Sequence, residues 1–196
     1  MTGIVLAGGV TVAGTSPALA HLNPGEHGSF AAGFSHPMFG LDHILAMVAV
    51  GLWAWQIGGR ALWAVPAGFV GTMAVGFLLA LAGVPLPFVE PAILASVVAI
   101  GLLVALALKL PVVPAAAIVG AFALFHGHAH GGEIGAATHL SYGFGFLIAT
   151  ALLHGVGIGL GHGLGLVLKN RGELAMTVSR VLGGLTVLAG LGLVAG

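Results

Sequence analysis

The sequence contains ten histidines, as many as its lysines, arginines, aspartates and glutamates together, and no cysteine. Imidazole is a ligand of borderline divalent transition metals, and carboxylates extend the choice of ligands. The lack of cysteine excludes thiolate metal sites, disulfides and cysteine catalysis. The chemistry open to this chain is therefore centred on its histidines and on the few acids near them.

The first group of such residues is Ser35-His36-Pro37-Met38-Phe39-Gly40-Leu41-Asp42-His43. Proline is favoured at the first helical position, so we expect a helix to begin at Pro37 with His36 at its mouth. His36 and His43 would then share a face but lie about 10 Å apart along the axis. Either the start of the helix is unwound and His36 folds back, or the residues bind an ion in turn. Alternatively, Asp42 and His43 form a buried pair that joins two helices.

The second group is Phe125-His126-Gly127-His128-Ala129-His130-Gly131-Gly132-Glu133. His126 and His130 have the i, i+4 spacing that lets two imidazoles on one helix face share a metal ion. His128 would point away from them, and Glu133 would lie on their side unless the glycines end the helix first. His139 could join this group. The alternative is a loop of solvated histidines outside the membrane.

Two histidines, His154 and His162, fall within a long apolar segment. Ionisable groups at membrane depth are costly and often mark a pathway, so His154 is a candidate relay point. A histidine bonded to a neighbouring helix is the alternative. The glycines at 155, 159 and 163, and those at 157, 161 and 165, are spaced four apart, which predicts helix-packing stripes rather than a nucleotide-binding loop.

The composition places these groups in a membrane. The chain is 59% hydrophobic and 5% charged, whereas soluble domains carry about 25% charged residues. Net charge is zero, which gives no electrostatic basis for binding nucleic acid. We expect an all-α bundle of transmembrane helices. Six spans are predicted, at Pro37–Ile57, Ala61–Ala82, Pro91–Leu108, Val112–His128, Tyr142–Leu168 and Leu174–Val194.

Residues 1–20 resemble a signal peptide, with an apolar stretch from Ile4 to Gly14 and an A-x-A-like cleavage site at Ala18-Leu19-Ala20. Cleavage would leave His21, a further candidate ligand, at the new N-terminus. The alternative is an uncleaved, short first helix. The domain expectation is a signal peptide at 1–20 and a six-helix domain at 21–196.

The basic residues set the orientation of these spans. All five fall at one face of a six-span arrangement: Arg60, Lys109, Lys169, Arg171 and Arg180. The positive-inside rule makes that face cytoplasmic. The mature N-terminus is then outside the cytoplasmic membrane, and both histidine groups gather at the outer face. A cation could be collected outside and passed inward.

Together, His36-Pro37-x-x-Gly40-x-Asp42-His43 and Phe125-His126-Gly127-x-Ala129-His130-Gly131-x-Glu133 resemble the HupE/UreJ family of nickel permeases, which are hydrogenase and urease accessory proteins. The resemblance extends over the whole chain. It implies roles in nickel uptake for six residues: His36, Asp42, His43, His126, His130 and Glu133. His128 occupies a free position of the motif. A related nickel/cobalt transporter family has a shorter His-to-Asp-His spacing, so cobalt remains open.

The function expected is uptake of a divalent ion, nickel or cobalt, for metalloenzyme maturation, with the metal as cargo and no resident cofactor. The chain has no Walker A motif, so ATP hydrolysis by that route is excluded. The expected partners are the metal ion, the lipid bilayer and, as an open question, further copies of the chain. The alternative is a membrane redox enzyme, either a di-metal hydroxylase or a cytochrome with His43 and His154 as axial haem ligands.

Overall fold

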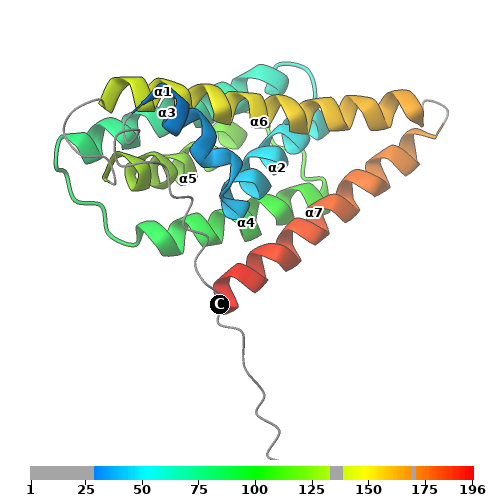
Figure 1. The fold of residues 1–196 in the computed structure, drawn as a ribbon. Helices are drawn as coiled ribbons and strands as arrows, with labels where there is room; N and C mark the ends of the chain where they lie inside the picture. Colours follow the sequence, from blue (N-terminus) through cyan, green and yellow to red (C-terminus); the bar gives the residue numbers. More distant parts are fainter. Residues whose placement is uncertain (1–28, 133–138, 169–170) are drawn as a thin grey trace, which may run out of the picture.

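The computed structural model describes residues 29–132, 139–168 and 171–196, and all regular structure within them is helical. The predicted signal peptide, His21 and Glu133 lie outside these residues. The helices, drawn in Figure 1, are α1 (Phe30–Ser35), η1 (His36–Met38, a 3₁₀ turn), α2 (Leu41–Ile57), α3 (Ala61–Leu81), α4 (Val89–Leu106), α5 (Val112–Gly132), α6 (His139–Val167) and α7 (Gly172–Ala195).

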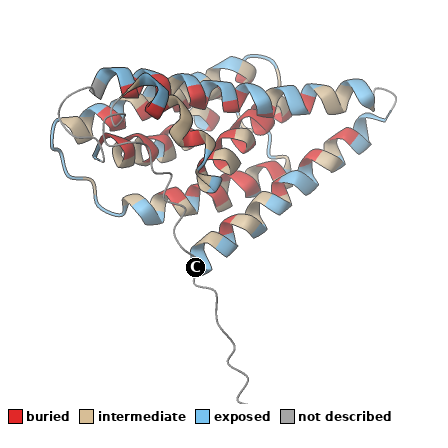
Figure 2. Cartoon of the chain, in the orientation of Figure 1, coloured by how far each residue is buried: buried red, intermediate tan, exposed pale blue. Residues whose placement is uncertain are grey.

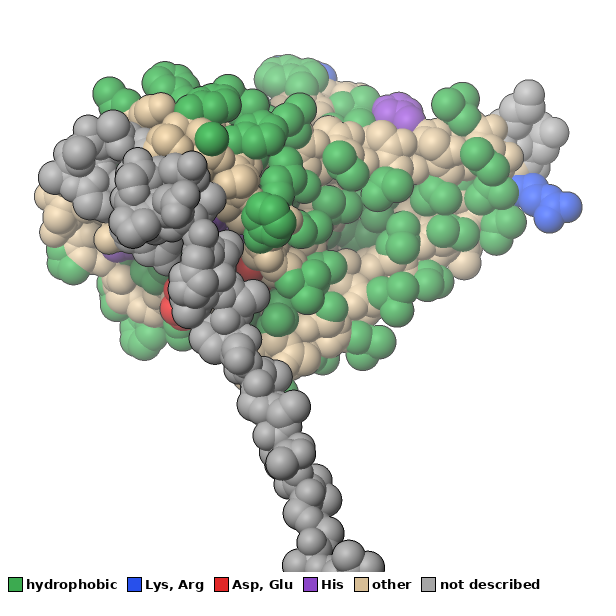
Figure 3. All heavy atoms as spheres, in the orientation of Figure 1, with side chains coloured by type: hydrophobic (Ala, Val, Ile, Leu, Met, Phe, Trp, Pro, Cys, Tyr) green, Lys and Arg blue, Asp and Glu red, His purple; other side chains and the backbone are tan. Residues whose placement is uncertain are grey.

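Helices α3 to α7 are each long and apolar enough to cross a membrane. A sixth span is formed if α1 and η1 are joined with α2, although the two parts meet at an angle of 80°. The predicted all-α bundle of transmembrane helices is therefore confirmed. Hydrophobic side chains are spread over the described part of the face seen in Figure 3, where charged side chains are few, as expected for a surface in contact with lipid.

The predicted start of the first span was wrong. Pro37 lies in the 3₁₀ turn η1, which the backbone N–H of Phe39 closes by donating to His36 O at 3.2 Å. Gly40 is extended, and α2 begins only at Leu41. Asp42 and His43 consequently occupy the first turn of α2 rather than a position more than one turn inside a helix. The proline started a turn, but a short one, because the extended Gly40 interrupts the helix.

The fourth predicted span was too short. Helix α5 continues beyond His128 to Gly132, so the glycines do not break it before that point. A Cβ on Gly127 would collide with the carbonyl oxygen of Met73, and one on Gly76 would collide with that of Leu124. Glycine is required at these positions because α3 and α5 touch at their backbones. This close approach fixes the histidines of α5 against the rest of the bundle.

The most extensive packing joins α3 to α5, α4 to α7 and α2 to α6, and the buried residues follow the inward faces of these helices (Figure 2). One predicted glycine stripe contributes to the α2–α6 contact, where Gly157 lies against the Val48 carbonyl and Gly161 against the Trp55 ring. The other predicted stripe does not pack against the part of the chain that the structure describes. A Cβ on Gly155, Gly159 or Gly163 would meet nothing within 4 Å.

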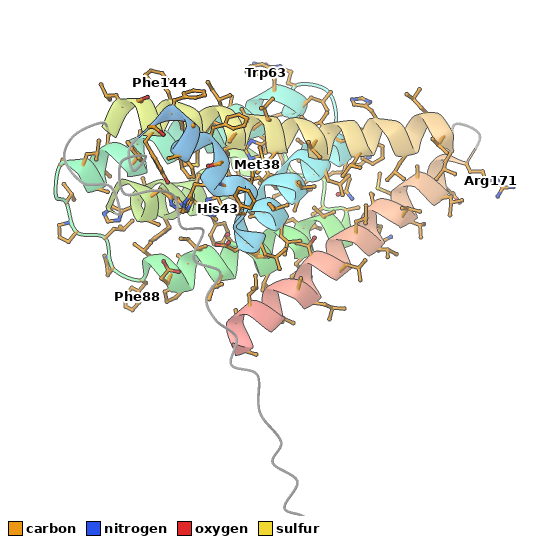
Figure 4. All side chains as sticks on the ribbon, viewed as in Figure 1. Met38, His43, Trp63, Phe88, Phe144 and Arg171 are labelled. Carbon is orange, nitrogen blue, oxygen red and sulfur yellow. The ribbon has the colours of Figure 1, made fainter. Side chains whose placement is uncertain are left out.

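The two ends of the bundle differ in their side chains. Figure 4 shows Arg171 at the tip between α6 and α7, and Phe88, which precedes α4, at the opposite end. Arg180 lies within α7, and its Nε donates to Ala105 O at 2.9 Å, close to the end of α4. Its guanidinium therefore reaches toward the end that carries Arg171, as expected for a basic side chain that snorkels out of a membrane.

Candidate metal centre

Four histidine rings from three segments form a continuous row that we call the imidazole file. Its members are His36 in η1, His43 in α2, and His126 and His130 in α5. Ring centroids are 4.5 Å apart for His36 and His130, 4.8 Å for His130 and His43, and 4.6 Å for His43 and His126. His36 is half-buried, and the other three are buried. The two motifs, separated by more than 80 residues of sequence, thus form one cluster.

The bend between η1 and α2 brings His36 into the file. On one straight helix His36 and His43 would be too far apart for joint action. The 80° bend instead places both rings beside His130, one on each side. The sequence left two arrangements open. The structure shows the first of them, in which the start of the helix is interrupted and His36 folds back toward His43.

A chain of polar contacts runs from Asp42 to Ser96. Asp42 Oδ2 lies 3.7 Å from His43 Nδ1, and His43 Nε2 lies 3.3 Å from His126 Nδ1. The other nitrogen of His126, Nε2, is 2.8 Å from Ser96 Oγ, which itself donates to Ile93 O at 2.6 Å. Because its proton is used there, the Ser96 hydroxyl accepts from His126, so Nδ1 of neutral His126 is left as an acceptor for His43.

Aromatic side chains enclose the file. Phe146 packs against His130 and His43, with ring centroids 4.6 and 5.7 Å away. Tyr142 lies beside His36 at 6.3 Å, and Phe69 beside His126 at 5.8 Å. These rings exclude water from the buried imidazoles, which strengthens every electrostatic interaction made there.

Ser96 and the aromatic residues are not among the site residues predicted from the sequence. Ser96 has a recognisable signal, because it and Glu90 are the only polar residues in the apolar sequence of α4. A buried hydroxyl in a membrane helix needs a hydrogen-bond partner. The aromatic residues carry no such signal, since the sequence offers many apolar side chains of similar size.

The file is packed ring against ring rather than opened around a cation. Among the described residues, no group of three or more histidine or acidic side chains is arranged to hold one metal ion. The His43–His126 hydrogen bond uses the nitrogen atoms that would coordinate a metal there. An ion entering at this point would have to replace that bond, with small rotations of two rings about their side-chain torsions.

The remaining predicted ligands lie elsewhere. His21 and Glu133 are outside the described residues, and His139 begins α6 with its side chain outside the described part. His128 lies 2.8 Å from Val84 O through Nε2 and faces away from the file. His154 is buried deeper in the bundle beside Phe69.

The position of His154 also bears on the haem alternative. His43 packs against His126 and His130, while a Cβ on Gly51 would collide with the His154 carbonyl oxygen. Gly51 is eight residues along α2 from His43, or about 12 Å in depth. The ring of His43 is thus packed against His126 and His130, and the ring of His154 against Phe69.

Comparison with known proteins agrees with the motifs. The family model described as HupE / UreJ protein matches residues 10–193. The chain is 47% identical over 182 residues to Protein HupE of Rhizobium leguminosarum bv. viciae, and the match covers 92% of each chain. No solved structure matches the chain. Because the family model spans nearly the whole sequence, the chain belongs to the HupE/UreJ family.

Proposed function

We propose that the protein is a membrane permease that takes up a divalent transition-metal ion, nickel or cobalt, through the imidazole file. The observation that carries this proposal is the convergence of four imidazoles from η1, α2 and α5 inside a bundle of membrane-spanning helices. Ionisable groups buried at such a place are retained at a cost in stability, and they commonly serve an ion pathway. Membership of the HupE/UreJ family supports the same conclusion.

Nickel and cobalt are favoured by the types of ligand. Imidazole nitrogen suits borderline divalent ions, whereas magnesium and calcium prefer oxygen ligands. Asp42 is beside His43 and 3.7 Å from its Nδ1. A carboxylate there orients the ring and partly compensates the double charge of the ion. Glu133, His21 and His139 are candidates to complete the coordination.

The file opens toward the outer face in this proposal. Arg60 precedes α3, Lys109 lies between α4 and α5, and Arg171 precedes α7, so alternation of the spans brings these bases to one end. The positive-inside rule makes that end cytoplasmic. His36 and His130 then lie toward the outside of the cytoplasmic membrane. This arrangement supports capture of the metal ion outside the membrane and its passage inward.

Metal uptake into reconstituted vesicles tests the proposal. Vesicles containing the wild-type protein should accumulate Ni²⁺ or Co²⁺ above protein-free vesicles, and should not accumulate Mg²⁺. His43→Ala should abolish the flux while leaving a folded, monodisperse protein. If the wild-type protein moves neither Ni²⁺ nor Co²⁺, the permease proposal is wrong.

A further inference from the structure

Histidine 154 is the one buried histidine of the described residues that lies outside the imidazole file. It is 1% exposed, and neither of its ring nitrogens has a hydrogen-bond partner among the described residues. An unpaired buried polar group costs about 1–3 kcal/mol. A histidine used only for packing would be better replaced by an apolar residue. The free-energy cost of burying two unpaired ring nitrogens indicates that His154 has a function beyond packing.

The depth of His154 follows from two neighbouring helices. On α6, Phe146 packs against the His43 ring, and His154 follows eight residues later. On α2, Gly51 lies against the backbone of His154 and follows His43 by the same number of residues. Both separations correspond to about 12 Å along a helix. His154 therefore lies about two helical turns closer to the basic end of the bundle than His43 does.

The ring of Phe69 lies between the imidazole file and His154 and contacts both. Its centroid is 5.8 Å from that of His126, the deepest member of the file, and 5.0 Å from that of His154. Thr150 Oγ1 and Met73 Sδ also lie in this region, and they are 3.8 Å apart and buried. Thr150 lies one turn before His154 on α6, and Met73 one turn after Phe69 on α3.

We propose that His154 is a second, inner metal-binding position, which receives the ion from His126 after it passes the Phe69 ring. Thr150 Oγ1 and Met73 Sδ would serve as weak metal ligands between His126 and His154. A bare divalent ion would be strongly destabilised in the apolar interval between the His126 and His154 rings, because a charge at membrane depth is costly without ligands. A neutral imidazole offers a lone pair and no negative charge, so it holds the ion less tightly than the Asp42–His43 pair and favours release inward.

This inference rests on the proposed permease function and makes a separate kinetic prediction. Capture of external metal depends on the file, and transfer beyond it depends on His154. Loss of the inner ligand should therefore lower the maximal rate of uptake and leave the external concentration for half-maximal uptake nearly unchanged. Loss of a file ligand should instead abolish uptake, because external metal is then no longer captured.

The test uses His154→Phe, which keeps a ring against Phe69 without a donor atom, and His154→Gln, which keeps polarity at similar volume. The control is His162→Gln on the same helix, where the native side chain is exposed. We expect both His154 variants to lower the maximal Ni²⁺ or Co²⁺ uptake rate by about tenfold or more, and the control to match wild type. Wild-type rates in His154→Phe would overturn the inner site but leave the permease function standing.

A binding measurement keeps the inference testable if the His154 variants do not fold. The double variant His43→Ala/His130→Ala retains His154, and in detergent both ends of the bundle are accessible. Titration with Co²⁺ should give a visible absorption band of histidine-ligated cobalt in this variant, and the same band should be absent when His154→Phe is added in a folded triple variant. A double variant that binds no Co²⁺ while the wild-type protein does would overturn the inner site. Absence of Co²⁺ and Ni²⁺ binding and transport in the wild-type protein would instead reject the permease function.

Discussion

His43 Nε2 lies 3.3 Å from His126 Nδ1, so a single hydrogen bond joins the first turn of α2 to the interior of α5. These two residues come from the two separate histidine motifs of the sequence. Their contact brings the motifs into one buried row of imidazoles, with Asp42 at one side and Ser96 at the other.

Removing Asp42 or a histidine of the imidazole file should abolish uptake without unfolding the protein. We expect Asp42→Ala, His43→Ala and His130→Ala each to reduce Ni²⁺ or Co²⁺ uptake to the level of protein-free vesicles. His128→Ala is the matched control, since His128 faces Val84 and not the file, and its effect should be mild. Uptake is measured beside size-exclusion profiles. Normal transport by all three ligand variants would mean that these residues are structural.

Removing the hydroxyl of Ser96 should impair the file through His126. Ser96→Ala leaves His126 Nε2 without its 2.8 Å partner, and loss of a group that orients a metal ligand typically costs about 10–100-fold in metal affinity or activity. Ser179→Ala is the control, because it removes another buried serine that accepts from Gln56 Nε2 at 2.9 Å, away from the file. Equal uptake by the two variants would argue against a positioning role for Ser96.

The glycines of the second motif should be required for packing. Gly127→Ala forces a methyl group into the Met73 carbonyl, and overpacking of this kind costs about 1–3 kcal/mol. We expect a lower thermal unfolding temperature in detergent. Gly155→Ala is the control, since a Cβ there meets nothing within 4 Å. An unchanged unfolding temperature for Gly127→Ala would show that α3 and α5 can separate at no cost.

The orientation can be tested with single cysteines because the native chain has none. Arg171→Cys should be protected from a membrane-impermeant thiol reagent in intact cells and should react after the cells are opened. Gly132→Cys, which replaces an exposed residue at the end of α5, should react in intact cells. The reverse pattern would invert the topology and with it the proposed direction of uptake.

Much of the fold could be predicted from the sequence because lipid imposes simple rules. Apolar segments long enough to span the bilayer identified α3 to α7, and the histidine spacing selected four residues that the structure brings together. The broken start of α2 could not be predicted from Pro37 alone, because the end of a 3₁₀ turn depends on tertiary contacts of His36 and on the extended Gly40. Phe69 could not be predicted because its role arises from packing between helices distant in sequence, whereas Ser96 stands out as one of two polar residues in the apolar sequence of α4.

Voltage-driven metal uptake tests the central claim most directly. A divalent ion gains about 4.6 kcal/mol on crossing 100 mV inward, at about 2.3 kcal/mol per charge, which supports more than about a thousandfold accumulation. Vesicles with an inside-negative potential and no pH gradient should therefore accumulate Ni²⁺ or Co²⁺ when they contain the wild-type protein, and not when they contain His43→Ala. A flux that does not depend on the potential but requires a proton gradient would show that the protein is a coupled exchanger and not a uniporter. A wild-type flux no greater than that of protein-free vesicles would contradict metal permeation through this bundle.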